Sequence, residues 1–420
     1  MGMPNGRRKS SWVLLALALA SVSCMTLEPH PSSPAPSQPQ TATRATLQLS
    51  ATELADGRFV GLAFSGGGSR AALFGAAVMK ELDRVGLLSQ VDVLSAVSGG
   101  ALPAASYALD GYRDLSFQNG FLEQIGRDFQ AAVLGPWYMA PPNAFRLLLT
   151  KTIAADRVIR ALDDGLFHGA TYRDLNPSRP ILLLNSTDAL TGDPLVISQE
   201  RFAELGQPLA PFSIARAVYM SAAYPDVLEP LALDRGGPGL NGSAPPPLLA
   251  YDGGAADNLG IRTLMQVLDV ASTQRPWQEL FPRGCLVLSI DATGRKQNEA
   301  RRPLSAAAVL LKSHRRDLLE LAGIPASDQD VARFGRFPVG RNGDGGSCDF
   351  WHLALRQLPD SDPLGKQVTQ IKTNLGLSAE EQAALTEAAA RLVANGLAEL
   401  RTRNGLAKFL EGRPMVQSQP

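Results

Sequence analysis

Three short segments of this sequence contain residues that could carry out chemistry. They are Ser65 to Arg70 with three successive glycines, Ser98-Gly99-Gly100, and Asp252-Gly253-Gly254. Each segment follows an apolar run that is typical of a buried strand, so all three are expected at strand ends. A serine, a carboxylate and a glycine-rich turn are together the parts that a hydrolase with a serine nucleophile needs.

The glycine-rich segment lies between a predicted strand and a predicted helix. Gly66, Gly67 and Gly68 allow a tight turn whose backbone N–H groups point the same way, and at a helix N-terminus such a turn binds an anion. The oxyanion of ester hydrolysis is one such anion. A plain strand-to-helix connection is the alternative. A dinucleotide site is disfavoured, because Ala71 fills the last glycine position of its fingerprint and no acidic residue ends the next strand.

Ser98 follows a predicted strand over 91–97 and precedes a run of small residues. This pattern fits a nucleophile elbow, a sharp strand-to-helix turn whose small neighbours leave the serine Oγ accessible. Gly100 fills the last position of the usual G-x-S-x-G pattern, whereas Ala96 replaces its first glycine. A serine at a helix start is also a good N-cap, and the segment alone does not separate the two roles.

Asp252 ends an apolar strand predicted over 248–251. Active sites of parallel α/β sheets collect at the carboxyl ends of the strands, which favours a functional carboxylate there. An Asx turn at the strand end is the alternative. The nearby Asp257 is predicted to cap a helix.

Histidine is not an obvious partner of these residues. The chain has four histidines, and none lies in a recognisable catalytic motif; they are His30, His168, His314 and His352. A Ser-His-Asp triad through His314 or His352 is the competing arrangement.

The apolar runs indicate the elements that position these segments. The sequence predicts a helix over 71–85 and strands over 59–64, 91–97, 181–185, 195–198, 248–251 and 285–291. The strands are apolar on both faces, as in a parallel sheet that helices cover on both sides. The predicted fold is therefore a three-layer α/β/α sandwich with a mostly parallel central sheet. A last helix starts at the capping box of Ser378 and Glu381 and is predicted to end near Gly396.

In their order, the three segments closely resemble the patatin-like phospholipase family, and the resemblance covers nearly the whole chain from Gly61 onward. It includes four further segments, namely 172–175, 179–183, 221–225 and 371–373. The resemblance implies the patatin-like fold. It also implies hydrolysis of acyl esters of lipids, of phospholipid or lysophospholipid type, by a Ser–Asp dyad without histidine, metal or cofactor.

By the same resemblance, Ser98 is the nucleophile and Asp252 its base. The oxyanion loop carries over to Gly66, Gly67, Gly68, Ser69 and Arg70, and the glycines beside the dyad are Gly99, Gly100, Gly253 and Gly254. Ala71 and Ala96 stand where the family usually has glycine, and the geometry survives unless either position needs a positive φ. Two alternatives stay open: a carboxylesterase that acts on soluble esters, and a catalytically silent envelope lipoprotein that binds lipid or a partner.

The composition allows a full-sized core and excludes several classes of protein. Hydrophobic residues make up 45% of the 420 positions, and 40 basic residues balance 40 acidic ones. Without clustered positive charge, nucleic acid is not an expected partner. No cysteine–histidine group has zinc-site spacing, and the Gly- and Asp-rich segment 341–349 lacks calcium-loop spacing. The segment 134–149 is either a wall or lid of an acyl pocket or an ordinary packed loop.

The first residues have the layout of an export signal. Basic residues at 7–9 precede an apolar run over 12–20, which is too short for a comfortable membrane span. Cleavage after Ala20 would leave a soluble protein, whereas the stretch from Ser21 to Cys24 resembles a lipoprotein box in which Cys24 is lipidated.

We therefore expect a signal peptide over 1–24, a Pro/Ser/Thr-rich tether over 25–56, a catalytic domain over 57–410 and a flexible tail over 411–420. The protein is expected in the cell envelope, at the outer membrane or in the periplasm, with peripheral membrane contact through a lipid anchor, or secreted. Cys285 is predicted on a buried strand and Cys348 in a glycine-rich loop, and whether they form a disulfide stays open.

Overall fold

The computed structural model describes residues 43–109, 119–134, 152–225, 227–236, 245–294, 336–338, 347–402 and 409. Contacts divide the chain into Met1–Gln40 and Thr41–Pro420, and every described residue belongs to the second unit. Several predicted features lie outside the described residues. They are the signal peptide with Cys24, the tether up to residue 42, nearly all of 134–149, residues 341–346 of the segment 341–349, His30, His314 and the tail. Within the described ranges, no helix has the length and apolar character that a membrane crossing requires.

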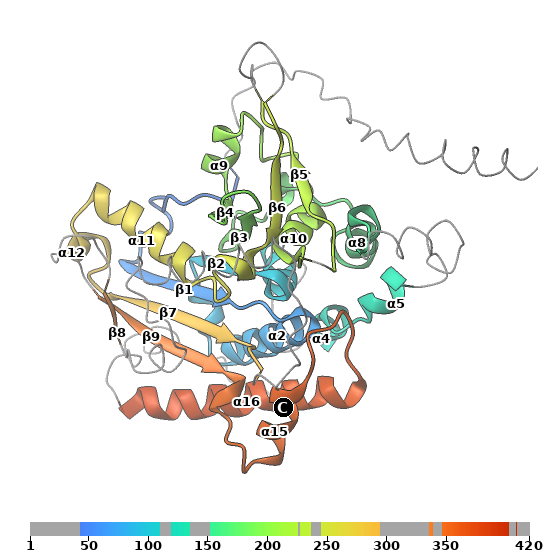
Figure 1. Cartoon of the computed structure of the whole chain (residues 1–420). Coiled ribbons are helices and arrows are strands. Elements are labelled where there is room, and N and C mark those ends of the chain that lie inside the picture. Colours follow the sequence, from blue (N-terminus) through green and yellow to red (C-terminus); the bar gives the residue numbers. More distant parts are fainter. Residues whose placement is uncertain are drawn as a thin grey trace, which may run out of the picture. The chain divides into compact units, whose positions relative to one another are not determined.

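The centre of the fold is a sheet with nine strands among the described residues (Figure 1). In sheet order they are β5 (Leu231–Leu233), β6 (Leu248–Asp252), β3 (Ile181–Asp188), β2 (Val93–Val97), β1 (Arg58–Phe64), β7 (Gly284–Asp291), β9 (Ser347–Ala354) and β8 (Arg336–Pro338), with β4 (Pro194–Ile197) also on β3. The five strands from β3 to β9 are parallel, whereas β4, β5, β6 and β8 pair antiparallel at the two sides.

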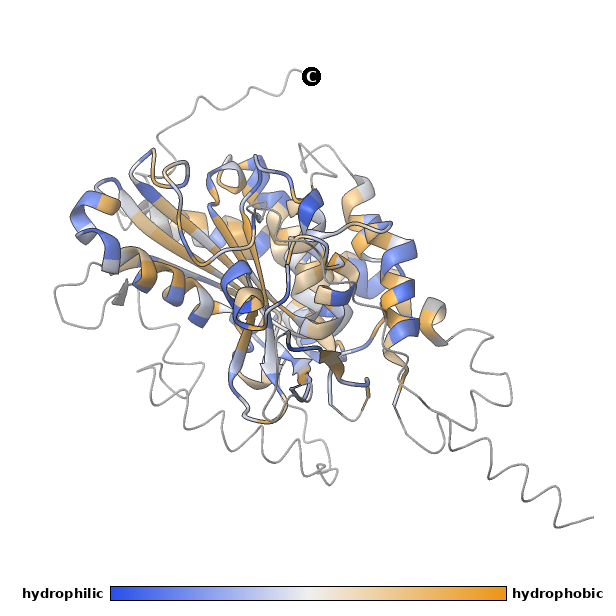
Figure 2. Ribbon diagram, turned by 90° about the horizontal axis from the view of Figure 1, so that it is seen from above, coloured by the Kyte–Doolittle hydropathy of each residue, from blue (hydrophilic) through white to orange (hydrophobic). Residues whose placement is uncertain are grey.

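Helices cover both faces of the sheet, because its central strands are apolar on both sides. Along β1, Leu62 and Phe64 face one layer of helices, while Phe59 and Ala63 face the other. The first layer includes α2 (Gly68–Arg84), α3 (Ala101–Ala108), α10 (Ile214–Ala222), α15 (Pro363–Gln370) and α16 (Ala379–Thr402), and the second includes α11 (Ile261–Gln274) and α12 (Trp277–Leu280). The other α-helices of the described residues are α4 (Asn119–Ile125), α5 (Phe129–Leu134), α8 (Ala155–Leu162) and α9 (Gln199–Glu204). The predicted three-layer sandwich is thus confirmed, and Figure 2 shows its apolar strands from above.

Two strands differ in direction from the prediction. The sequence predicts 195–198 and 248–251 as strands of the parallel type, but β4 and β6 both run antiparallel to β3. Only a few residues separate β3 from β4, and a parallel neighbour needs a connection of a dozen or more residues. β6 pairs with the part of β3 that extends beyond β2. Its carboxyl end therefore returns to the level at which β2 ends.

The end of α2 follows from its local sequence. Gly86 comes after the helix with a φ of 74°, and its N–H donates to the Asp83 carbonyl. The next N–H, of the fully buried Leu87, donates to the Leu82 carbonyl. These two bonds form a Schellman motif, so the stop predicted at Gly86 is confirmed.

The last helix, α16, confirms one prediction and contradicts another. Ser378 and Glu381 exchange the two hydrogen bonds of a capping box at its start. The predicted end near Gly396 is wrong, because the helix continues to Thr402. A Cβ at Gly396 would lie 2.4 Å from Trp351 Nε1, so this glycine lets the helix pack closely on β9.

Residues 43–56, predicted as the end of the tether, pack against the domain instead. Ala45 and Leu49 are buried, and the carbonyl of Ala45 accepts the N–H of Gln199 at 2.7 Å. The proline-rich part of the predicted tether ends at Pro39. After it, apolar residues alternate with others at positions 45, 47 and 49. This alternation is the signal of a packed extended segment.

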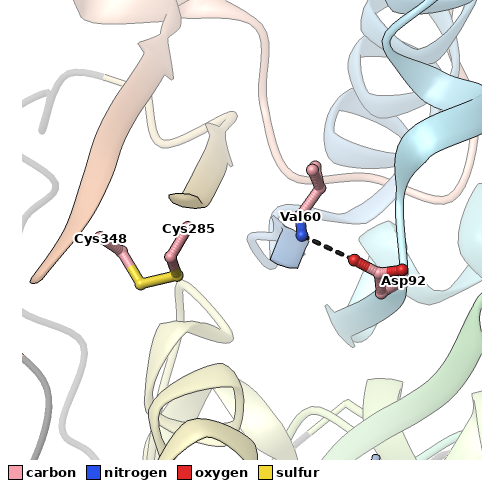
Figure 3. Close-up of a disulfide and its surroundings, with 4 residues drawn as sticks. All are labelled: Val60, Asp92, Cys285 and Cys348. Atoms are coloured by element: carbon pink, nitrogen blue, oxygen red, sulfur yellow. Dashed lines mark hydrogen bonds between the residues drawn. A yellow bond between two sulfur atoms is a disulfide. The ribbon is translucent and has the colours of Figure 1, made fainter. Parts of the chain in front are cut away.

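Cys285 and Cys348 form a disulfide between the neighbouring strands β7 and β9 (Figure 3). Their Cα atoms are 4.5 Å apart. Cys348 lies near the start of β9 and not in a loop, which corrects the prediction for this residue. The two cysteines are 63 residues apart in the sequence. The same figure shows Asp92, whose carboxylate accepts the Val60 N–H of β1.

Candidate active site

Ser98 lies at the turn between β2 and α3, and it is buried. Its Oγ donates a hydrogen bond to Asp252 Oδ2 at 2.7 Å. Its φ is 53°, a left-handed conformation that costs a residue with a Cβ about 1–2 kcal/mol. Because the Oγ bonds to a carboxylate and caps no helix, the N-cap alternative does not describe this serine. The sharp turn has the geometry of a nucleophile elbow.

Asp252 is the last residue of β6 and is 6% exposed. Its Oδ2 accepts the Ser98 hydroxyl, and its Oδ1 accepts the Gly254 N–H at 2.7 Å. The second bond is the Asx turn that the sequence allows, so the carboxylate makes both contacts at once. Burial raises the pKa of Asp252 to about 6, against the opposing effect of the two hydrogen bonds. Such a carboxylate is ionised at neutral pH and is a stronger base than an ordinary aspartate.

The antiparallel direction of β6 brings these two side chains together. β2 ends with Val97 beside Asn185 of β3, and Asp252 pairs with the next β3 residue, Ser186. Ser98 and Asp252 therefore leave the sheet at one level and on the same edge of β3, because β4 occupies the other edge. The sequence predicts their proximity from the carboxyl ends of parallel strands, and that reason is wrong. β3 extends past β2, and β6 returns along the extension.

The glycine-rich turn touches the elbow through backbone atoms. A Cβ on Gly99 would lie 2.0 Å from the Gly68 carbonyl oxygen, so only glycine fits at position 99. Gly68 is also the first residue of α2. The positive end of the α2 dipole therefore lies beside Ser98, where the charge of an oxyanion would develop.

The hydrogen bonds of the turn narrow the predicted set of oxyanion donors. The N–H groups of Gly66 and Ser69 already donate to backbone carbonyls elsewhere in the chain. Across the part of the chain that the structure describes, the N–H groups of Gly67 and Gly68 have no acceptor. The Arg70 N–H likewise has no acceptor among the described residues, so these three donors are the ones in the predicted set that a ligand oxygen can use.

Arg70 holds the turn in place. Its buried guanidinium donates to the Ile371 carbonyl and, at 3.5 Å, to Thr373 Oγ1. The carbonyl of the next residue, Asn374, accepts the Ser69 N–H at 2.9 Å. The segment after α15 is thus bonded to the turn by the Ser69 N–H and by the Arg70 side chain, so Arg70 has a structural contact here.

The other predicted glycine and alanine positions fit the site. Gly100 and Gly253 lie in the short turns that follow Ser98 and Asp252. Ala71 and Ala96, at usual glycine positions of the family, are both buried, and neither has a positive φ. The alanines therefore leave the geometry intact.

Other polar residues that the sequence singles out have separate roles. His352 lies on β9, 3.5 Å from Asp291, and β9 is the third strand from β2, about 14 Å away at the usual strand spacing. A triad through His352 is therefore wrong. His168 follows a π-helical turn over 163–167. The carboxylate of Asp257 accepts the N–H of Arg262 in the first turn of α11 at 2.9 Å, although Gly260 and not Asp257 occupies the N-cap position.

The buried hydroxyl of Ser221 contacts Ser98, and the sequence does not predict this contact. The Ser98 N–H donates to Ser221 Oγ at 2.8 Å, and Ser221 Oγ donates to the Asn185 carbonyl at 2.6 Å. Ser221 belongs to the segment 221–225, which enters the sequence analysis only as part of the family resemblance. The partners come from β2, α10 and β3, so no local spacing in the sequence could reveal the contact.

Comparison with solved structures gives the following relatives. Human GIVD cytosolic phospholipase A2 aligns at 15% identity with a TM-score of 0.48, over 87% of this chain and 61% of that one. Its complex with methyl gamma-linolenyl fluorophosphonate aligns at 16% identity and 0.45, over 87% and 63%. VipD from Legionella pneumophila aligns at 13% identity and 0.34, over 87% and 72%.

The chain thus spans about three fifths of the human structures that it matches. No curated protein sequence matches it. Residues 62–265 match the family described as patatin-like phospholipase, and this range contains both Ser98 and Asp252. Residues 62–265 therefore form a patatin-like phospholipase domain.

Proposed function

We propose that this protein is a serine acyl hydrolase that cleaves acyl esters of lipids, with Ser98 as nucleophile and Asp252 as base. The observation that carries the proposal is the 2.7 Å hydrogen bond from Ser98 Oγ to a buried carboxylate. Beside this dyad lie the N–H groups of Gly67 and Gly68, which have no acceptor among the described residues. Nucleophile, base and oxyanion donors are the three parts that acyl transfer needs. The family supports a lipid as the substrate class.

In the first half-reaction, Ser98 Oγ attacks the carbonyl carbon of the ester while Asp252 accepts the hydroxyl proton. The carbonyl oxygen becomes an oxyanion, and the N–H groups of Gly67 and Gly68 stabilise it. Losing one such donor typically costs about 3–4 kcal/mol of transition-state stabilisation. The intermediate then expels the alcohol, which takes the proton from Asp252, and the acyl group stays on Ser98 as an ester.

In the second half-reaction, water hydrolyses the acyl-enzyme. Asp252 accepts a proton from the water as its oxygen attacks the acyl carbon, and a second oxyanion forms at the same donors. Collapse of this intermediate releases the fatty acid, and the proton returns to Ser98 Oγ. The pKa of about 6 lets Asp252 act as base and then as acid within one turnover near neutral pH.

A fluorophosphonate probe tests the nucleophile directly, because it reacts covalently with an activated serine. We expect the probe to label the wild type and not Ser98→Ala, and ester hydrolysis to disappear with the label. Ser198→Ala is a matched control, since Ser198 is also a buried serine and lies at a helix start. If folded Ser98→Ala retained the activity of the control, the assignment would be wrong.

The substrate class needs a second assay. Initial rates on phosphatidylcholine vesicles are compared with those on a short soluble ester such as p-nitrophenyl butyrate. A higher kcat/KM on the vesicles supports a lipid hydrolase, whereas a preference for the soluble ester makes the protein a carboxylesterase. Absence of labelling and of both activities would leave a protein that only binds.

We further propose that the protein acts outside the cytoplasm, in peripheral contact with a membrane. The Cys285–Cys348 disulfide supports this location, because disulfides persist in oxidising compartments. Metabolic labelling with radioactive palmitate tests whether a lipid on Cys24 anchors the protein. Wild type should carry the label, and Cys24→Ser should not. An unlabelled wild type that appears in the culture medium would contradict lipidation and support secretion.

A further inference from the structure

The last turn of α10 contacts both members of the proposed dyad. Ser221 Oγ accepts the Ser98 N–H at 2.8 Å. Two residues later, the carbonyl of Ala223 accepts the Asp252 N–H at 3.1 Å. One segment of three residues is therefore bonded to the backbone of the nucleophile and to the backbone of the base.

Ser221 is itself fixed by β3. Its hydroxyl is fully buried and donates its single proton to the Asn185 carbonyl at 2.6 Å. The oxygen therefore has only lone pairs left for Ser98, and it can act there only as an acceptor. Asn185 is held in turn, because its side chain donates to Ser95 Oγ at 2.9 Å and accepts the Thr263 hydroxyl at 2.6 Å.

Ser98 needs such support because its backbone is strained. A residue with a Cβ keeps a left-handed φ, here 53°, only where its surroundings over-determine that conformation. The bond to Ser221 fixes the orientation of the peptide plane that precedes the Ser98 Cα. That plane sets the direction of the Cα–Cβ bond, and hence the position of Oγ relative to Asp252.

We propose that Ser221 is a positioning residue for the nucleophile: its hydroxyl holds Ser98 in the left-handed conformation that directs Oγ at Asp252. This inference rests on the proposed function, since it concerns the rate of the proposed acyl transfer. Ser221 is buried behind the elbow, so its loss changes the reacting geometry and not substrate binding. A misplacement of reacting atoms by about 1 Å costs on the order of 10²-fold in rate.

The test measures kcat and KM of Ser221→Ala per folded molecule, together with the rate of fluorophosphonate labelling. We expect kcat and the labelling rate to fall on the order of 10²-fold, with KM within about twofold of wild type. The pH profile should keep its midpoint, because Asp252 keeps its own contacts. Ser221→Thr retains the hydroxyl and should recover most of the lost kcat.

The matched control is Ser198→Ala, whose fully buried hydroxyl also accepts a backbone N–H, from Arg201 at 3.2 Å. It should lower the melting temperature without changing kcat by more than about twofold. If Ser221→Ala behaved like this control, the inference would be wrong. If Ser221→Ala does not fold, Ser221→Cys replaces it, because the thiol has a similar size and is only a weak acceptor. A change in kcat of less than about twofold in this variant would likewise contradict the inference. A wild type without activity or label would instead refute the proposed function.

Discussion

Replacing Asp252 with asparagine should strongly lower the activity and, at neutral pH, make the protein more stable. Burial raises the pKa of this carboxyl from 3.8 to about 6 in the folded protein. A difference of about two pKa units corresponds to about 3 kcal/mol. The free energy of unfolding is lower by this amount when the carboxylate is ionised, because the folded protein holds the charge away from water. Asparagine has nearly the same shape and carries no charge, so this cost disappears.

The stability that Asp252→Asn gains over wild type depends on pH in a defined direction. The folded pKa lies above the unfolded one, so the folded state binds the proton more tightly. Below pH 3.8 the carboxyl is protonated in both states, and the charge costs nothing. Between pH 3.8 and about 6, the unfolded state releases the proton first, and wild-type stability falls as the pH rises. Above pH 6 the full cost is present.

Urea unfolding of wild type and Asp252→Asn at pH 3.5 and pH 7.5 measures this effect. We expect the variant to gain up to about 3 kcal/mol relative to wild type between the two pH values, while kcat falls by about 10²–10⁴-fold. Asp174→Asn is the control of opposite sign, because hydrogen bonds from Thr171 lower the pKa of Asp174. Equal stability differences for Asp252→Asn at both pH values would refute the raised pKa, and retained activity would refute the role as base.

Three further predictions concern pH, the disulfide and the contact of the two turns. The kcat/KM of wild type should rise through an apparent pKa of about 6 and be about tenfold lower at pH 5 than on its plateau; a flat profile between pH 5 and 8 would contradict Asp252 as base. Replacing Cys285 and Cys348 by alanine together should lower the free energy of unfolding by about 4 kcal/mol, from the closed stretch of 63 residues, and an unchanged urea midpoint would argue against the disulfide. Gly99→Ala should cost about 1–3 kcal/mol and most of the esterase activity, because its Cβ would meet the Gly68 carbonyl; full activity in that variant would show that the contact of the turns is loose.

Local signals in the sequence predict the central part of the fold well. The doubly apolar runs at 59–64 and 285–291 identify two of the parallel strands, and the glycine at position 86 ends its helix as expected. Each of these features depends on the residue and its near neighbours alone. The places of Ser98 and Asp252 at strand ends follow in the same way, since each residue comes directly after an apolar run. Their proposed roles do not, because they rest on the combination of three segments and on the family resemblance.

The sequence does not predict features that depend on residues far away in the chain. The direction of β6 depends on the extension of β3 past β2, and an apolar run carries no information on direction. Gly396 is a packing contact of α16 with Trp351, although a glycine late in a helix pattern usually marks its end. Ser221 acquires its contact only when α10 packs behind the elbow. In all three cases the deciding residue lies far away in the chain.

The way β6 pairs with β3 limits which changes of length this protein can accept. Side chains on a strand alternate between faces, so a shift of β6 by one residue would put Tyr251 in place of Asp252 and turn the carboxylate to the other face. A shift by two residues would restore the face but move the carboxylate by about 7 Å. Insertions within 248–252 should therefore be lethal to activity. Insertions between β5 and β6 do not change the pairing of β6 with β3, which fixes the position of Asp252. New loops can therefore be added there during evolution or design without separating Ser98 from Asp252.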